Sequence, residues 1–331
     1  MLAATATIAA AAPPAAPDPL LAPYAAPKLL ARLPDGRRIN LVCMGHGSPT
    51  VIMTAGLGDW SAAWRKVQGE IAADTRVCAW DRAGFGFSDP SPAPQDLAHT
   101  TADLEQALKA AGIAGPYVVA GHSLGGYESL LFADRHRGEV AGMVLVDPSV
   151  PGQSRMFAAR APRLKAYVDG LSAQAIDGIR SCVDKLKSKA DAHACLDYPP
   201  DYPPDLKRAM TPYDLDPARG VTEISLYASF DKATDMVVDP ARTYGDMPLV
   251  VLSALGVRAD LPPGAPPEAM AEMDGFLDAL IHDRDTMAAL STRGVNRRIE
   301  GTSHYIQMIK PEVVIAAIRE VVGEARASAA R

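Results

Sequence analysis

Short runs of apolar residues alternate along the chain with longer stretches in which apolar residues recur at helical spacing. The apolar runs lie within residues 30–45, 49–58, 75–90, 117–120, 140–149, 247–256 and 295–308. Helical spacing fills intervening segments such as 61–73, 100–113, 124–140 and 311–325. Short apolar runs bounded by glycine and polar residues are typical of buried strands. This alternation predicts an α/β fold with a mostly parallel central sheet flanked by helices.

The pattern changes between residues 150 and 246. Apolar strand runs stop there, and helical spacing dominates on both sides of the proline-rich stretch "YPPDYPPDLKRAMTP" at 198–212. A helical segment between two strand-bearing regions is typical of an inserted subdomain. We therefore expect residues 150–246 to form a helical cap, and residues 27–149 and 247–331 to form the core.

The N-terminal stretch "MLAATATIAAAAPPAAPDPLLAP" is rich in alanine and proline and has no charge before Asp18. It resembles the apolar region and small-residue cleavage site of a secretory signal whose basic start is missing. A disordered leader is the alternative. We expect residues 1–26 to lie outside the fold, and we favour an exported (periplasmic or secreted) protein over a cytoplasmic one.

Charge and composition exclude several classes of protein. The 331 residues carry a formal net charge of −6 and no run of lysine or arginine, so no basic face for nucleic acid is expected. The apolar N-terminal stretch is too short and too interrupted by proline to span a membrane. The four cysteines form no C-x-x-C pair, so no zinc site is expected.

One strand ends in the sequence "YVVAGHSLGGY" at residues 117–127, where Ser123 lies between Gly121 and Gly125. Helical spacing follows directly. A serine in the pattern G-x-S-x-G between a strand and a helix is the arrangement of a nucleophile elbow. It would place Ser123 at a helix N-terminus, where free backbone N–H groups can stabilise an oxyanion. A plain turn is the alternative.

These motifs together resemble the α/β-hydrolase superfamily from about Leu30 to Glu324. The matching stretches are "TAGLGDWSAAW", "WDRAGFGFSD", "GHSLGG", "VLVD" and "GTSHYI". The likeness is greatest to bacterial esterase-like serine hydrolases. It implies an α/β-hydrolase fold with an inserted helical cap, a serine nucleophile, and neither cofactor nor metal.

A serine hydroxyl needs a general base, and the resemblance points to His304 in the loop "GTSH". The acid that orients this base is less clear from sequence. The family's commonest acid position is occupied by Gly256, so we favour Asp147, at the end of the preceding strand run. Asp260 is the first alternative, followed by Asp283 and Asp285.

The backbone N–H groups of Leu57 and Leu124 are expected to form the oxyanion hole, because they follow a strand end and the candidate nucleophile. In the loop "DRAGFGFSD", Asp81 and Arg82 are expected to pair with each other and to hold the loop beside the site.

The resulting hypothesis is a serine hydrolase that cleaves a small-molecule carboxylic ester through an acyl-enzyme. Amides, thioesters, lactones or carbon–carbon bonds would use the same residues. A ligand-binding or signalling protein with slow or no turnover is the alternative from another class. The expected partner is a small-molecule acyl substrate.

The resemblance also bears on the cysteines. In this fold's strand order, the strands that carry Cys43 and Cys78 are neighbours, so a disulfide can join them in an exported protein. Cys182 and Cys195 flank a short polar stretch and would close a small loop. Four buried free thiols are the alternative, which a cytosolic chain would favour.

Overall fold

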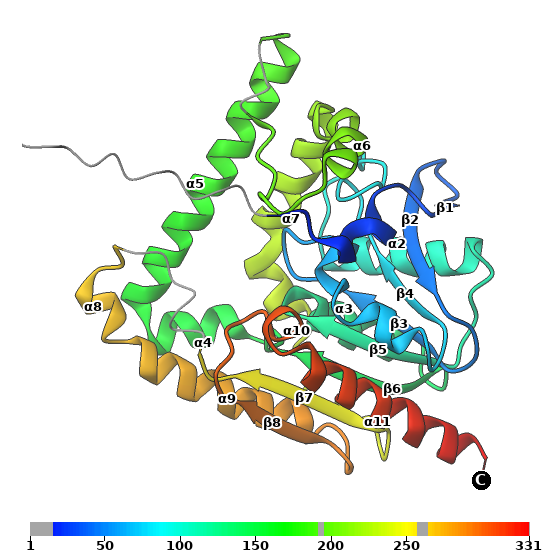
Figure 1. Cartoon of the computed structure of the whole chain (residues 1–331). Helices are drawn as coiled ribbons and strands as arrows, with labels where there is room; N and C mark the ends of the chain where they lie inside the picture. The colour runs from blue at the N-terminus through cyan, green and yellow to red at the C-terminus, as the bar shows by residue number, and fades with distance from the viewer. Residues whose placement is uncertain (1–15, 191–194, 257–263, 331) are drawn as a thin grey trace, which may run out of the picture.

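The computed structural model describes residues 16–190, 195–256 and 264–330. Within them, eight strands form one sheet in the order β1-β2-β4-β3-β5-β6-β7-β8 (Figure 1). The strands are β1 (Leu29–Arg32), β2 (Arg38–Met44), β3 (Thr50–Thr54), β4 (Val77–Trp80), β5 (Tyr117–His122), β6 (Val140–Val146), β7 (Leu249–Ala254) and β8 (Val295–Ile299). Only β2 pairs antiparallel to its neighbours β1 and β4; the remaining pairs are parallel. The predicted α/β fold is confirmed.

Side chains alternate between the two faces of the sheet along each strand. Because apolar side chains lie on both faces, helices cover both of them. In β3, Ile52 belongs to the apolar layer on one face, whereas Val51 and Met53 belong to the layer on the other. The first layer includes α2 (Leu97–Ala110), α3 (Leu124–Arg135) and α9 (Met273–Ala288). The second includes the 3₁₀ helix η2 (Ser61–Trp64), α1 (Gln68–Ile71), α10 (Ile306–Ile309) and α11 (Pro311–Ala329).

Between β6 and β7 the described part of the chain contains helices and no strand. These helices are α4 (Gln153–Arg160), α5 (Pro162–Lys187), α6 (Pro204–Asp214) and α7 (Pro217–Met236). Figure 1 shows α5 projecting away from the sheet and α7 standing between α5 and the core. The short helix α8 (Pro267–Met270), which follows β7 in the chain, packs against α5. The chain thus leaves the sheet after β6, forms a helical insertion, and returns in β7, which pairs directly with β6.

Residues 61–73 do not form the single helix that their spacing predicts. The chain forms η2 and then one turn of α1, and the Arg65 N–H bonds the Ala62 carbonyl in the tighter i to i−3 pattern. Trp64 is buried, so tertiary packing outweighs the local helical preference here.

The expectation that the chain up to Ala26 lies outside the fold is wrong for Asp18–Tyr24. Pro19–Tyr24 form a 3₁₀ helix whose Leu21 and Tyr24 side chains are buried. Asp18 forms an ion pair with Arg65 at 2.7 Å, and the Tyr24 hydroxyl donates to Gln68 at 2.6 Å. Two buried side chains, an ion pair and a hydrogen bond attach this stretch to the core, which composition alone did not reveal.

Both disulfides considered from the sequence are present in the structure. The register of β2 and β4 places Cys43 directly opposite Cys78, and their sulfur atoms are bonded. Cys182, near the end of α5, is bonded to Cys195. The second bond therefore ties the long helix of the insertion to the segment that leads into α6.

Candidate active site

Ser123 lies at the sharp turn between β5 and α3. Its backbone has φ 52° and ψ −119°, a conformation that non-glycine residues rarely adopt and that functional sites often hold. A Cβ atom at Gly121 would overlap the Gly125 carbonyl oxygen, and one at Gly125 would overlap the Thr54 carbonyl oxygen. Both flanking glycines are therefore required by the close approach of backbone across the turn.

Asp147 and His304 meet at the same edge of the sheet. Asp147 directly follows β6, the strand next to β5, and His304 follows β8. His304 Nδ1 lies 2.6 Å from Asp147 Oδ2. Asp147 is 1% exposed, whereas the His304 side chain is 30% exposed. With Nδ1–H donating to the carboxylate, the other ring nitrogen of His304 is the basic one.

Arg284 of α9 is a site residue that sequence reasoning missed. It donates to Asp147 Oδ1 at 2.6 Å and to the Pro148 carbonyl at 3.1 Å. The Ala254 N–H donates to the same Asp147 oxygen at 2.7 Å. Burial acts to raise the pKa of Asp147, but the Arg284 charge and the His304 hydrogen bond outweigh it and hold that pKa below its usual value.

A signal for Arg284 was present in the sequence. The buried side chains of α9 include Met273, Phe276, Leu280, Arg284 and Met287. They recur at intervals of three and four residues, so the arginine falls in the middle of an apolar stripe. An arginine at such a position needs a buried anionic partner.

His122 supports the loop that carries His304. Its ring is 1% exposed, and its Nε2 lies 3.0 Å from the His304 carbonyl oxygen. The rings of His122 and His304 have centroids 4.6 Å apart. Burial, assisted by the nearby His304 charge, lowers the pKa of His122 well below its usual value. A neutral His122 therefore donates through Nε2 and leaves Nδ1 as an acceptor, 3.9 Å from an Asp59 oxygen.

Asp147 is the one candidate acid for which the described residues show a hydrogen bond to His304. Gly256 has no room for a side chain, because a Cβ there would overlap the Thr302 carbonyl oxygen. Asp260 lies outside the described residues. Asp285 accepts from Asn296 and Arg298, both at 2.8 Å. Burial raises the pKa of Asp283.

The two N–H groups expected for the oxyanion hole lie at adjacent strand ends. Leu57 is three residues beyond β3, and Leu124 begins α3, where an N–H has no partner within the helix. In the described part of the chain, neither N–H donates a hydrogen bond to another protein group. β3 and β5 are paired neighbours, with Thr54 opposite Gly121. Both donors are thus available near Ser123.

Comparison with known sequences finds partial matches. Residues 49–180 match a family model described as the alpha/beta hydrolase fold. The uncharacterised protein YqjL of Bacillus subtilis is 33% identical over 106 residues, which are 32% of this chain and 42% of YqjL. The putative carbamate hydrolase RutD of Cronobacter sakazakii is 33% identical over 102 residues, 30% of this chain and 38% of RutD. The chain thus spans less than half the length of these curated relatives.

Solved structures match over most of the chain. A thermophilic esterase from Thermogutta terrifontis has a TM-score of 0.55 at 20% identity, covering 91% of this chain and 99% of the esterase. An epoxide hydrolase from hot-environment metagenomes has a TM-score of 0.61 at 19% identity, covering 89% and 97%. A putative lipase from Acinetobacter baumannii has a TM-score of 0.60 at 19% identity, covering 93% and 96%. The chain has the α/β-hydrolase fold.

In this α/β-hydrolase fold, Asp81 and Arg82 do not pair, contrary to expectation. Asp81 accepts hydrogen bonds from the Asn40 side chain and from backbone N–H groups that include Phe87. Arg82 instead forms an ion pair with Glu128 at 2.7 Å. Adjacent residues at a strand end point to opposite sides, so one closes its own loop while the other reaches under α3.

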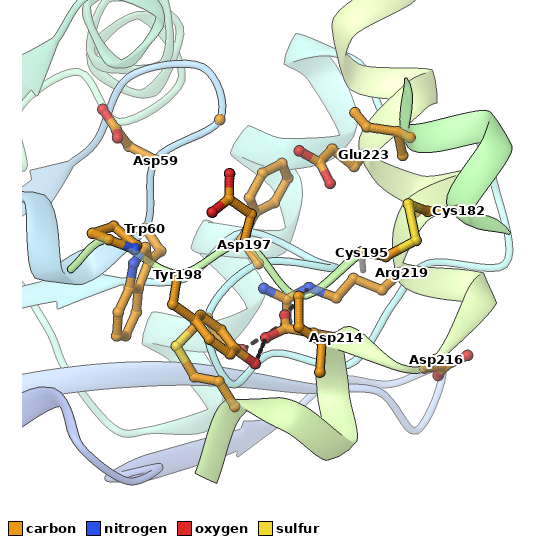
Figure 2. A pocket seen from close by; sticks show the side chains of 18 of the residues that line it. Asp59, Trp60, Cys182, Cys195, Asp197, Tyr198, Asp214, Asp216, Arg219 and Glu223 are labelled. Atoms are coloured by element: carbon orange, nitrogen blue, oxygen red, sulfur yellow. Dashed lines mark hydrogen bonds and ion pairs between the residues drawn. A yellow bond between two sulfur atoms is a disulfide. The ribbon is translucent and has the colours of Figure 1, made fainter. Parts of the chain in front are cut away.

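A cavity of about 760 Å³ lies between the loop after β3 and helices α5, α6 and α7 of the insertion (Figure 2). Gly58, next to Leu57, lines one end, whereas Ser123 and His304 do not line it. Burial raises the pKa values of Asp59 and Glu223, two acidic residues of its wall. The wall also includes the aromatic residues Trp60, Phe85, Tyr198 and Tyr202. No cluster of His, Cys, Asp or Glu suited to a metal ion occurs in the described part of the chain.

Proposed function

We propose that this protein is a serine hydrolase that cleaves a small-molecule carboxylic ester through an acyl-enzyme. The observation that carries the proposal is the 2.6 Å contact between His304 Nδ1 and Asp147 at the strand edge where Ser123 turns into α3. In this scheme Ser123 is the nucleophile, His304 the general base and Asp147 the acid that orients the base.

The proposed reaction has two similar halves. His304 removes the hydroxyl proton as Ser123 attacks the ester carbonyl, and the N–H groups of Leu57 and Leu124 bind the oxyanion. His304 then protonates the leaving alcohol. Water, activated by the same histidine, releases the acid from Ser123. Asp147 stays ionised throughout, since Arg284 stabilises its negative charge.

A carboxylic ester is the default substrate for this set of groups, because its alcohol leaves more easily than the amine of an amide. Amides, thioesters, lactones and carbamates remain alternatives that would use the same residues. The cavity beside Leu57 would bind the part of the substrate that is distant from the reacting carbonyl.

Epoxide hydrolysis is a poorer fit to this chain, although epoxide hydrolases share its fold. Opening an epoxide with the Ser123 hydroxyl would leave an ether on the enzyme. An ether has no carbonyl that water can attack, so the intermediate would not be released. A carboxylate nucleophile would form a cleavable ester instead, but position 123 carries a serine.

The proposal is tested with a panel of acyl esters of increasing chain length together with a serine-directed fluorophosphonate probe. We expect steady turnover and rapid labelling that Ser123→Ala abolishes. His304→Ala should lower kcat by several orders of magnitude, as removal of a triad member does. The matched control is His99→Ala, since His99 also contacts an aspartate, Asp96, at 2.7 Å but does so on the surface.

A ligand-binding or signalling protein on this fold is the rival proposal. It would bind acyl compounds in the same cavity without steady release of product. Saturable binding of an ester with no turnover, and with slow or single labelling of Ser123, would favour the receptor. Ester turnover that persists in both Ser123→Ala and His304→Ala would contradict the serine hydrolase and the receptor alike.

We also propose that the protein works in an oxidising compartment outside the cytoplasm. The two disulfides support this, because such bonds persist mainly in exported proteins. No helix in the described ranges combines the length and apolar character needed to cross a bilayer. Fractionation of cells that express the full chain would test the location, and recovery with the cytosolic marker would contradict it.

A further inference from the structure

Arg82 lies two residues after β4, and its side chain is almost wholly buried. Its guanidinium binds two kinds of partner, a carboxylate and backbone carbonyls. Nε and Nη2 each donate to the Glu128 carboxylate at 2.7 Å. Nη1 donates to the Gly56 carbonyl at 2.8 Å, and Nη2 donates to the Ala55 carbonyl at 2.6 Å. The planar fork of an arginine can satisfy a carboxylate and two carbonyls at once, which a lysine cannot.

The two carbonyls that Arg82 holds belong to successive peptide units in the loop after β3. The Gly56 carbonyl and the Leu57 N–H lie in one planar trans peptide, so they point in opposite directions. Fixing the oxygen on Arg82 therefore fixes the direction of the Leu57 N–H. The Ala55 carbonyl fixes the Gly56 N–H in the same way. Arg82 thus fixes the orientation of the Leu57 N–H, the expected oxyanion donor, from the opposite side of its peptide unit.

Glu128 links this loop to the helix that carries Ser123. It lies in α3, five residues after Ser123, and is fully buried. Its carboxylate accepts from Arg82 and also from the Thr54 hydroxyl at the end of β3. The Arg82–Glu128 pair therefore connects the end of β3 and the loop after β4 with the N-terminal half of α3.

We propose that the Arg82–Glu128 pair is a positioning device that holds the Leu57 N–H toward the oxyanion formed at Ser123. The inference rests on the proposed serine hydrolase. Removing an oxyanion donor costs about 10² to 10³ in kcat in enzymes of this kind, because the donor must be in place before charge develops. Arg82 touches no substrate and acts only through the peptide that it holds.

The direct test is Arg82→Lys, which keeps a positive charge opposite Glu128 but cannot bridge both carbonyls. We expect kcat for the best ester to fall by about 10- to 100-fold, less than for loss of the donor itself. KM should change by less than about 3-fold, since ground-state binding is not involved. Affinity for a boronic acid that mimics the tetrahedral intermediate should fall in step with kcat.

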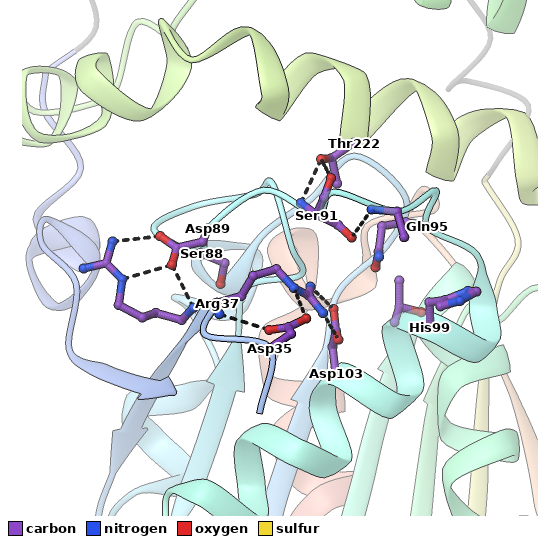
Figure 3. Close-up of polar contacts among 12 residues, drawn as sticks. Asp35, Arg37, Ser88, Asp89, Ser91, Gln95, His99, Asp103 and Thr222 are labelled. Carbon is purple, nitrogen blue, oxygen red and sulfur yellow. Dashed lines mark hydrogen bonds and ion pairs between the residues drawn. The ribbon is translucent and has the colours of Figure 1, made fainter. Parts of the chain in front are cut away.

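Arg37→Lys is the matched control. Arg37 also holds a carboxylate with two hydrogen bonds, to Asp103 at 2.6 and 2.7 Å (Figure 3). That pair joins the β1–β2 turn to α2, and within the described residues neither side chain forms a hydrogen bond with the loop after β3 or with α3. Arg37→Lys should leave kcat unchanged at a similar loss of unfolding free energy. An equal fall in kcat for both variants would show that general destabilisation, and not positioning, explains the effect.

A readout that does not need turnover separates this inference from the proposed function. In a crystal structure of Arg82→Lys, the Gly56–Leu57 peptide unit should be reoriented. In a hydrogen-exchange experiment, the proteolytic fragment that contains Leu57 should exchange its backbone N–H groups faster. An unchanged orientation of the Gly56–Leu57 peptide unit in Arg82→Lys overturns the inference even if kcat falls. If the unmodified protein has no ester turnover and yet the Gly56–Leu57 peptide unit is reoriented in Arg82→Lys, then Arg82 positions the loop and the proposed function fails.

If Arg82→Lys does not fold, Glu128→Gln takes its place. Glutamine keeps the shape of the side chain and one carbonyl acceptor for Arg82, but it removes the negative charge that anchors the guanidinium. The same fall in boronic acid affinity, with KM preserved, is expected in smaller measure. Unchanged kcat and unchanged boronic acid affinity in a folded Glu128→Gln would contradict the role of the pair.

Discussion

Arg284 and Asp147 form an ion pair with a 2.6 Å separation, and the two side chains are only 3% and 1% exposed. Two charges removed from water are stable together only when their geometry is good and their remaining hydrogen-bonding groups are satisfied. Here the Pro148 carbonyl, the Ala254 N–H and His304 complete the set. The pair keeps Asp147 charged next to a partly exposed histidine.

We expect Arg284→Met to raise the pKa of Asp147, since burial then acts against the charge without the arginine to offset it. The acid limb of the pH profile of kcat/KM should move to higher pH. Loss of one partner of a buried pair also lowers the unfolding free energy by about 3–5 kcal/mol. Arg284→Lys keeps the positive charge and should shift the acid limb less than Arg284→Met does. Urea denaturation and ester kinetics across pH measure the two effects.

The control for Arg284→Met is Arg242→Met. Arg242 forms an ion pair with Asp134 at 2.8 Å in which the arginine is buried and the aspartate is 19% exposed, and this pair joins α3 to the segment before β7. Arg242→Met should lower the unfolding free energy without shifting the acid limb of the kcat/KM profile. The same shift in both variants would mean that the pH profile does not report on Asp147.

Asp147→Asn should leave the protein folded but lower kcat by about 10⁴, because an asparagine favours the wrong tautomer of His304. Asp260→Asn, at the alternative acid that lies outside the described residues, should cost little. The measurement is steady-state turnover of the best ester by both variants. The reverse order of activities would move the acid to the later loop and would end the assignment of Asp147.

His122 should make stability depend on pH. In the unfolded chain the imidazole takes up a proton near the ordinary histidine pKa of about 6.5, whereas burial holds the pKa of the folded ring far below that value. Protons therefore favour the unfolded state, and stability falls as the pH drops below about 6.5. The expected slope from this one group is about 1.4 kcal/mol per pH unit.

His122→Gln removes this titration while keeping a side-chain N–H that can donate to the His304 carbonyl. The difference in unfolding free energy between the protein and this variant, measured in urea from pH 5 to 8, should shrink or reverse as the pH falls. A difference that is constant across this range would show that His122 is not held neutral in the fold.

Mass spectrometry of protein made in an oxidising compartment should find no alkylatable thiol. Cys182 and Cys195 are separated by 13 residues, and a loop of about that size is expected to add about 3 kcal/mol of stability. The double variant Cys182→Ser/Cys195→Ser should therefore unfold more easily, and KM should rise because both residues line the cavity. The variant Cys43→Ser/Cys78→Ser, across β2 and β4, is the control and should change KM little. Four free thiols in the mature protein would refute both bonds.

Features that depend on neighbours in sequence were predictable. The run from Tyr117 to Ala120 followed by Gly121 predicted β5 and its turn, and helical spacing predicted α3 and α11. The strand end at Asp147 was visible for the same reason, since the buried β6 leaves a continuous apolar run in the sequence. The strand before His304 leaves no such run, because β8 has the sequence VNRRI and is only partly buried. Backbone geometry at Ser123 followed from the two glycines that must flank it.

Partners that come from distant segments were not predictable in the same way. Sequence alone left four aspartates as possible acids. The fold brings Asp147 against His304, because β5 and β6 are neighbours and the loop after β8 returns over them. Arg284, the partner of Asp147, comes from 137 residues away. Arg82 binds Glu128 and not the adjacent Asp81, because neighbouring side chains at a strand end point to opposite faces. Local spacing determines which elements form, whereas the pairing of buried charges depends on how those elements pack, and only the tertiary structure decides that.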